Sequence, residues 1–226
     1  MLNIFAQYDT IFFDLDDTLY PEIAYLKAAF AAIGQFSETH YALNAQQVED
    51  FLTTTFIKNG RQNLFNQCFK HFEAAIKASK CENTDLSRDY REGVLLDHIF
   101  VKNCLNILRT VEIKEKIRLY PFVYKLIPEL IKQEKQIFII TNGNITQQKN
   151  KVKHLQWNGI YASVTTVFAN QFAPKPSPKV FTDFLQPNFN LKNKSILFVG
   201  DAETDAEFSR NINVDFLHVD YFKQTL

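Results

Sequence analysis

The chain has 226 residues, of which 46% are hydrophobic, 14% aromatic and 22% charged. This composition is typical of a soluble, well-packed globular protein and excludes a largely disordered chain. The 25 lysines and arginines balance the 25 aspartates and glutamates, so no net field would attract nucleic acid or an anionic membrane. We therefore predict neither as a partner, and no apolar run approaches the length that spans a bilayer.

Five short apolar segments are predicted to be buried parallel strands. In chain order they are residues 10–15, 136–141, 163–169, 194–200 and 214–220. Most are apolar on both faces, as expected for strands covered by helices on both sides. Helical patterning lies between the later strands, at residues 122–133, 146–155, 178–185 and 202–210. Pro128 should kink or restart the first of these helices. The alternation predicts an α/β fold with a Rossmann-like, doubly wound parallel sheet.

The interval between the first and second strands contains no convincing strand. Helical periodicity covers residues 22–40, 45–58, 61–80 and 86–109, with Gly93 as a possible break in the last. This interval of roughly a hundred residues is far longer than a crossover helix requires. We predict an inserted all-helical domain at residues 21–118, hung from a core domain that comprises residues 1–20 and 119–226.

Cysteine usage and the start of the sequence indicate a cellular compartment. Cys68, Cys81 and Cys104 are an odd number of cysteines without C-x-x-C spacing, which is typical of reduced thiols in a cytosolic protein. Residues 1–10 carry no basic residue and only a short apolar stretch, which argues against a signal peptide. We therefore predict a cytoplasmic location.

The first predicted strand runs directly into the acidic segment Asp14-Leu15-Asp16-Asp17-Thr18. Side chains two residues apart share a face of an extended chain, so Asp14 and Asp16 can converge beyond the end of the strand. Open α/β sheets bind their ligands at that edge. Two close carboxylates imply a cation or a shared proton. The alternative is a polar turn in which Asp17 or Thr18 caps the next helix.

Two other predicted strands lead to polar segments that could bind an anion. Thr141, Asn142 and Gly143 offer a hydroxyl, an amide and backbone N–H donors. In Pro174-Lys175-Pro176, the prolines restrict the backbone around a lysine that could neutralise a phosphate or a carboxylate. Taken singly, these two segments are explained more simply as an ordinary turn and a solvated loop.

A fourth polar segment follows the strand at residues 194–200. Asp201 and Asp205 lie one helical turn apart, and their oxygens suit Mg²⁺, although Asp201 could instead be a helix N-cap. All four segments follow the carboxyl ends of predicted parallel strands, so we expect them to face one crevice. Together they supply a nucleophile, metal ligands, phosphate donors and a cation.

These segments resemble, in order, the four motifs of the haloacid dehalogenase superfamily of hydrolases. Residues 14–18 match its D-x-D-x-T motif, Thr141 its Ser/Thr motif, Lys175 its lysine, and Asp201 with Asp205 its acidic motif. The helical insertion stands where the family's C1-type cap belongs. There are departures, since Ser177 stands where the family often has Asp, and residues 211–213 replace its usual Ala-Gly pair. Neither departure touches the chemistry.

The resemblance implies a Mg²⁺-dependent phosphatase that hydrolyses a small phosphorylated metabolite through an aspartyl phosphate. It implies that Asp14 is the nucleophile, that Asp16 is the general acid and base, and that Lys175 orients Asp14. Mg²⁺ would be held by Asp14, the Asp16 carbonyl and Asp201, with Asp205 behind these direct ligands. The phosphoryl group would be bound by Thr141, Asn142 and Gly143.

Other activities of the same superfamily remain as alternatives. A phosphomutase shares these catalytic residues, and a phosphonatase needs a cap lysine, for which Lys58 is a candidate. A dehalogenase has no need of Asp16, and a non-catalytic binding protein would not need acids at every motif. We expect the turn at residues 58–61 to set specificity, with Arg61 as a substrate ligand, or else Arg61 is simply solvated. Either a monomer or a homodimer fits the sequence, and the substrate itself does not follow from it.

Overall fold

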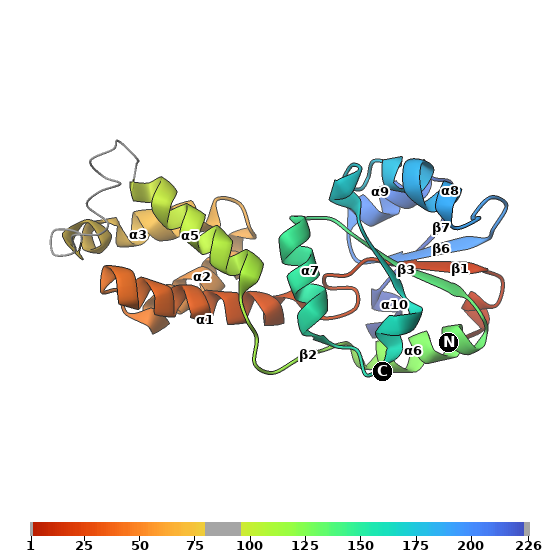
Figure 1. Cartoon of the computed structure of the whole chain (residues 1–226), viewed down its shortest axis with the longest axis horizontal. Coiled ribbons are helices and arrows are strands. Elements are labelled where there is room, and N and C mark those ends of the chain that lie inside the picture. Colours follow the sequence, from red (N-terminus) through yellow and green to blue (C-terminus); the bar gives the residue numbers. More distant parts are fainter. Residues whose placement is uncertain (1, 80–95, 224–226) are drawn as a thin grey trace. The chain divides into compact units, whose positions relative to one another are not determined.

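The computed structural model describes residues 2–79 and 96–223, and within the chain two compact units can be recognised (Figure 1). One unit comprises the residues up to Glu22 together with those from Lys114 onward, and we call it the core unit. The other, the helical unit, comprises Ile23–Ile113. Each unit is described by itself below.

A five-stranded parallel sheet forms the centre of the core unit. Its strands are β1 (Thr10–Phe13), β3 (Gln136–Thr141), β5 (Thr165–Phe168), β6 (Ile196–Gly200) and β7 (Asp215–His218). Their order in the sheet is β5-β3-β1-β6-β7, and in the central register Phe12 lies opposite both Phe138 and Phe198. The predicted strands and the predicted parallel α/β sheet are confirmed.

The strand order places a crossover beside β1. The chain passes from β1 to β3 and β5 on one side of the sheet, and then crosses to β6 and β7 on the other side. Open α/β sheets bind ligands at the carboxyl edge where the strand order reverses in this way. The loops that follow β1 and β6 therefore flank the expected binding crevice.

Helices surround this sheet, as the alternating pattern predicted. They are α6 (Pro121–Lys132), α7 (Ile145–His154), the π-helix η4 (Val180–Leu185), α8 (Gln186–Asn188), α9 (Glu203–Asn211) and α10 (Asp220–Lys223), with the 3-10 turns η1 (Leu2–Phe5), η2 (Ile160–Ser163) and η3 (Ala169–Gln171). Pro128 lies inside α6, which runs through it without a break. Of the two predicted outcomes, a kink or a restart, the restart does not occur.

A second, two-stranded parallel sheet was not predicted. It pairs β2 (Ile117–Arg118) with β4 (Leu155–Gln156), so Leu155 belongs to a strand and not to the end of the preceding helix. Two-residue strands are too short to show a period of two in the sequence.

Aromatic side chains pack on one face of the large sheet. Phe12, Phe138 and Phe198 occupy facing positions on three adjacent strands, and the Phe12 ring centroid lies 5.5 Å from that of Phe138 and 6.3 Å from that of Phe198. Phe181 and Phe208, from the flanking helices, complete this part of the core. Such burial of rings stabilises the sheet, and the loops at its carboxyl edge therefore extend from a well-packed core.

The described part of the helical unit consists of helices, as predicted. They are α1, which begins in the core unit (Glu22–Tyr41), α2 (Ala45–Asn59), α3 (Leu64–Ser79) and α5 (Leu96–Thr110). Asp17 Oδ1 accepts a hydrogen bond of 2.9 Å from the Glu22 N–H, so Asp17 caps α1, as the polar-turn alternative proposed. Cys81, Gly93 and the first part of the helix predicted at 86–109 lie outside the described residues.

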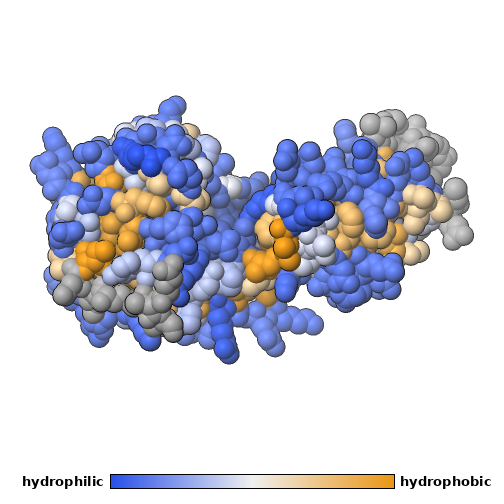
Figure 2. Space-filling model, turned by 180° about the vertical axis from the view of Figure 1, so that it is seen from behind, coloured by the Kyte–Doolittle hydropathy of each residue, from blue (hydrophilic) through white to orange (hydrophobic). Residues whose placement is uncertain are grey.

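The surface is mixed in character. Figure 2 shows hydrophilic residues over much of the visible face, with apolar areas between them. Among the described residues, the large hydrophobic side chains that are exposed are Ile57, Tyr161, Phe172 and Tyr221, and they come from four different segments. Within the described ranges, no helix has the length and apolar character needed to cross a bilayer.

Candidate active site

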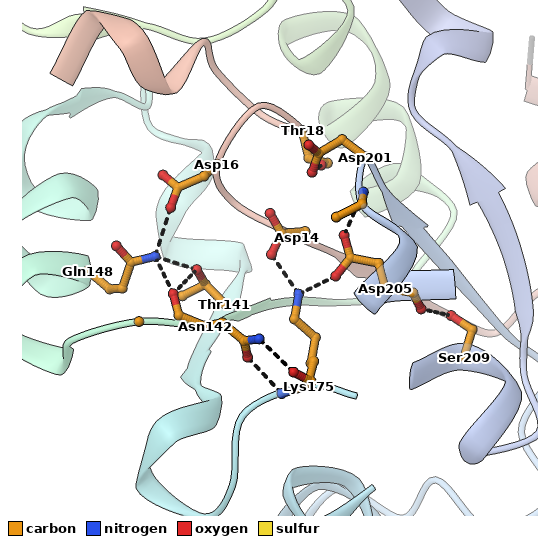
Figure 3. Close-up of polar contacts among 12 residues, drawn as sticks. Asp14, Asp16, Thr18, Thr141, Asn142, Gln148, Lys175, Asp201, Asp205 and Ser209 are labelled. Atoms are coloured by element: carbon orange, nitrogen blue, oxygen red, sulfur yellow. Dashed lines mark hydrogen bonds and ion pairs between the residues drawn. The ribbon is translucent and has the colours of Figure 1, made fainter. Parts of the chain in front are cut away.

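The predicted site residues of the core unit gather at one edge of the large sheet (Figure 3). Asp14 and Asp16 lie in the loop after β1, Thr141 is the last residue of β3, and Asp201 directly follows β6. Lys175 reaches the same place from the loop after η3. The parallel sheet thus brings together residues that are far apart in the sequence, as the strand pattern predicted.

Lys175 joins two of the acids. Its Nζ lies 2.6 Å from Asp14 Oδ1 and 2.6 Å from Asp205 Oδ1, and all three side chains are buried. Burial alone would lower the pKa of Lys175, but the carboxylates of Asp14 and Asp205 outweigh it and raise that pKa. The lysine is therefore a fixed cation beside Asp14.

Three carboxylates form a cluster that fits a divalent cation. Asp14, Asp201 and Asp205 each offer an oxygen, and these oxygens lie within 4.8 Å of one another. Lys175 offsets one of the three negative charges. Burial, followed by the charges of Asp205 and Asp16, raises the pKa of Asp14 to about 8, and burial with Asp205 also raises the pKa of Asp201. Oxygen donors with uncompensated negative charge are the set that Mg²⁺ prefers.

Asp201 and Asp205 differ in their surroundings. Asp201 is half-buried and accepts a hydrogen bond of 3.2 Å from the Thr18 hydroxyl. Asp205 has both oxygens engaged, one with Lys175 and the other with the Ala202 N–H at 3.3 Å. The N-cap of α9 is Ala202, so Asp201 is not the helix cap that the simpler interpretation required. Asp205 is therefore held by protein donors on both oxygens, and the predicted ranking of Asp201 before Asp205 as a metal ligand stays a prediction.

Asp16 lies apart from the carboxylate cluster. Its Oδ1 accepts a hydrogen bond of 2.6 Å from the Tyr20 hydroxyl, and its Oδ2 accepts from Gln148 Nε2 at 3.0 Å and from Lys151 Nζ at 2.6 Å. Figure 3 shows the Asp16 side chain directed toward Gln148 and Asp14 directed toward Lys175. Burial would raise the pKa of Asp16, but Lys151 above all, with the Tyr20 and Gln148 hydrogen bonds, holds it below its usual value.

The side chain of Asn142 binds the backbone of Lys175. Its side-chain Nδ2 donates to the Lys175 carbonyl at 2.9 Å, and its Oδ1 accepts from the Lys175 N–H at 2.8 Å. The Gly143 N–H donates to Asn170 Oδ1 at 2.8 Å, and Gln148 Nε2 lies 2.6 Å from the Thr141 hydroxyl oxygen. The predicted binding of substrate by residues 141–143 stays a prediction, and the side chain of Asn142 has the additional task of fixing Lys175.

Four further residues of this site were not predicted from the sequence. Tyr20, Glu22, Gln148 and Lys151 contact Asp16 directly or through one another. A signal was present on α7, where Gln148 and Lys151 are polar, three residues apart and therefore on the same side of the helix. That pattern alone does not separate a buried polar face from a solvated one.

Arg61 belongs to the helical unit. It is exposed and lies between α2 and α3, just after Gly60, whose φ of 67° ends α2. This backbone conformation favours glycine. The turn is present where the sequence predicted it, and contact between Arg61 and a substrate stays a prediction.

The family model for haloacid dehalogenase-like hydrolases matches residues 11–219, which is nearly the whole chain. The protein therefore belongs to the haloacid dehalogenase-like hydrolases. The helical insertion after β1 is consistent with a C1-type cap of that family.

Solved structures show the same fold. A hydrolase from Streptococcus pneumoniae TIGR4 is 17% identical, with 97% of this chain and 98% of that chain covered and a TM-score of 0.56. The putative hydrolase YfnB from Bacillus subtilis, bound to magnesium, is 17% identical, with 93% and 87% covered and a TM-score of 0.53. A predicted phosphoglycolate phosphatase from Haemophilus somnus 129PT is 22% identical, with 93% and 84% covered and a TM-score of 0.54. No curated protein matches the chain.

Proposed function

We propose that this hydrolase is a Mg²⁺-dependent phosphatase that acts on small phosphomonoesters through an aspartyl phosphate on Asp14. The observation that carries the proposal is the separation of two neighbouring acids into different environments. Asp14 belongs to the carboxylate cluster beside Lys175, whereas Asp16 is held outside it by Tyr20 and α7. Two carboxyl groups in different surroundings can perform two different chemical tasks.

The donor set suits a magnesium ion. Asp14, Asp201 and the backbone carbonyl of Asp16 would hold it, with Asp205 behind them, and the magnesium bound by the structurally similar YfnB supports this assignment. When bound, the ion would offset the repulsion between the Asp14 carboxylate and a phosphate group.

In the first half of the reaction, a carboxylate oxygen of Asp14 attacks phosphorus. The bond between phosphorus and the ester oxygen breaks. The negative charge of the bound phosphate would raise the pKa of Asp16 from its lowered value, so that Asp16 can carry a proton and give it to the departing oxygen. Lys175 fixes the orientation of Asp14 and offsets negative charge on the phosphoryl group, to which Thr141 donates a hydrogen bond. The products of this step are the free alcohol and an aspartyl phosphate.

In the second half, water attacks the phosphorus of the aspartyl phosphate. Asp16, now a carboxylate, takes a proton from that water, and the bond between phosphorus and the Asp14 oxygen breaks. Inorganic phosphate leaves, and Asp14 is again a carboxylate. The presence of Asp16, which can first give and then take a proton, favours a phosphatase over a dehalogenase, because the reaction of a dehalogenase at carbon needs no such acid.

Phosphate release by the purified protein tests the proposal. With Mg²⁺, a panel of phosphorylated metabolites and p-nitrophenyl phosphate should yield inorganic phosphate, and chelation of the metal should stop the release. Asp14→Asn should lower the rate by roughly three or more powers of ten, because an amide cannot replace the nucleophile. Halide release from a 2-haloacid without phosphate release from any ester would overturn the proposal, as would full activity of Asp14→Asn.

A further inference from the structure

Lys151 is a buried cation that the proposed reaction does not use. It lies on α7, its side chain is 0% exposed, and its Nζ is paired with Asp16 Oδ2 at 2.6 Å and with Glu22 Oε1. Removing an ammonium group from water is costly unless close partners compensate for it. Two carboxylates supply that compensation here.

Asp16 is correspondingly restrained on both of its oxygens. Tyr20 binds Oδ1, and Lys151 and Gln148 bind Oδ2. Tyr20 comes from the segment that follows β1, whereas Gln148 and Lys151 come from α7, so two separate elements define the plane of one carboxyl group. Gln148 is neutral, and Lys151 is therefore the charged member of this set of donors.

Glu22 restrains Lys151 in turn. It is the first residue of α1, and its own N–H is bound by Asp17 Oδ1 at 2.9 Å. The Glu22 carboxylate is buried and pairs with the Lys151 ammonium group, which also pairs with Asp16, so Lys151 bridges two acids. A lysine whose ammonium group is paired with two carboxylates has few rotamers open to it.

We propose that Lys151 is a positioning residue that holds the Asp16 carboxyl group in the orientation needed to protonate the leaving oxygen. This inference rests on the phosphatase function proposed above. Lys151 contacts Asp16 and Glu22, and it acts on the reaction through Asp16, with Glu22 fixing the ammonium group. The competing explanation is that Lys151 serves the stability of the fold alone.

The leaving group of the substrate separates these two explanations. An alkyl phosphate needs protonation of its leaving oxygen, whereas p-nitrophenyl phosphate has a leaving group that departs without much help. Lys151→Met should lower kcat/KM for the alkyl phosphate by about 100-fold, the lower end of the usual contribution of general acid–base catalysis, and by less than about 5-fold for p-nitrophenyl phosphate. Lys149→Met is the matched control, because Lys149 is an exposed lysine of the same helix, and it should change neither rate.

A double variant adds an independent criterion. If Lys151 acts through Asp16, the combination of Asp16→Asn with Lys151→Met should be no slower on the alkyl phosphate than Asp16→Asn alone, because the group that Lys151 positions is already lost. Independent, multiplied losses in the double variant would overturn the proposal. An equal loss on both substrates with Lys151→Met would also overturn it, since that result indicates a general disturbance of the site.

Two further outcomes are informative. If Lys151→Met does not fold, Lys151→Arg is the second variant, which keeps the charge but places its N–H donors differently. It should still slow hydrolysis of the alkyl phosphate more than hydrolysis of p-nitrophenyl phosphate. An equal effect on both substrates overturns the proposal. If wild-type protein with Mg²⁺ hydrolyses no phosphate ester at all, the proposed function itself fails, and the inference about Lys151 falls with it. Activity of the wild type on both esters therefore distinguishes failure of the inference from failure of the function.

Discussion

Asp14 and Asp16 are separated by one residue, and their surroundings shift their pKa values in opposite directions. Burial and neighbouring acids raise the pKa of Asp14, whereas Lys151 and two hydrogen bonds lower that of Asp16. The difference arises because the loop after β1 directs one side chain toward the carboxylate cluster and the other toward α7. A divalent cation would favour the ionised form of Asp14, which is the form that a nucleophile requires.

In the absence of metal, Asp14 should make the protein less stable as pH rises. Its pKa is raised from 3.8 to about 8, so its contribution to the free energy of unfolding is complete below the lower value and is lost as pH rises through the upper one. Asp14→Asn cannot ionise and should escape this loss. In the presence of a chelator, its Tm relative to that of the wild type should increase by roughly 10 °C or more between about pH 4 and pH 8. A Tm difference that does not change over this range would contradict the assignment.

Two thiols of the helical unit should be chemically protected. Cys68 on α3 and Cys104 on α5 are buried, and burial raises the pKa of Cys68 to about 12 and that of Cys104 further still. Because the thiolate is the reactive form, alkylation of both at pH 8 should be at least about 100-fold slower than for a free thiol and should become fast on unfolding. Mass spectrometry that assigns the label to each cysteine is the measurement. Rapid labelling of either residue in the native protein would refute it.

At the scale of elements, the turn between β6 and α9 depends on a close approach to a glycine. A Cβ atom added at Gly200 would lie 2.4 Å from Asp205 Oδ2 and 2.7 Å from the Asp205 Cβ. Asp205 is buried and held by Lys175, so it has little room to move. The last residue of β6 therefore has to lack a side chain if Asp205 is to face the site.

Gly200→Ala should accordingly destabilise the fold and displace Asp205. We expect a loss of about 1–3 kcal/mol in the free energy of unfolding, the usual cost of overpacking a buried site, together with weaker Mg²⁺ binding. Denaturant unfolding and a metal titration measure the two effects. Gly143→Ala is not an equivalent control because Gly143 has a φ of 126°. Unchanged stability and metal affinity in Gly200→Ala would show that Asp205 adapts.

The elements that sequence analysis predicted are those with a strong local signal. The apolar runs identify β1, β3 and β6, and because parallel strands share a carboxyl edge, Asp14, Thr141 and Asp201 could be assigned to one site. The two-residue strands β2 and β4 have too few residues to carry a pattern. The contacts of Lys151 with Asp16 and Glu22 join polar residues of different elements, and such pairing leaves no periodicity in the sequence.

For the molecule as a whole, the fold is that of a haloacid dehalogenase-like hydrolase with a helical insertion after the first strand. The functional groups of the core unit follow from the sheet, whereas substrate contact by the helical unit, including Arg61, stays a prediction. Sequence pattern predicts helices for the insertion but does not reveal which of their exposed residues meet a ligand.

Mg²⁺ should stabilise the entire core unit, because the unfolded chain lacks the carboxylate cluster. At a concentration of about 100 times its Kd, the ion should add about 2.7 kcal/mol to the free energy of unfolding. Asp201→Ala should abolish most of this gain, and more of it than Asp205→Ala, since Asp205 has both oxygens engaged by protein donors. Thermal unfolding with and without Mg²⁺ provides the comparison. A larger loss of stabilisation in Asp205→Ala than in Asp201→Ala would contradict the proposal that Asp201 is the direct ligand.

The proposed function requires that Asp14 becomes covalently phosphorylated during turnover. Asp16→Asn should slow the attack of water on the aspartyl phosphate, so that the intermediate accumulates when an activated aryl phosphate supplies the phosphoryl group. The direct measurement is an acid quench of this variant with substrate and Mg²⁺, followed by peptide mapping by mass spectrometry. We expect a phosphoryl group on Asp14, which should be absent when Asp14→Asn is added. Phosphate release without any phosphorylated residue, or a phosphoryl group on another side chain, would contradict it.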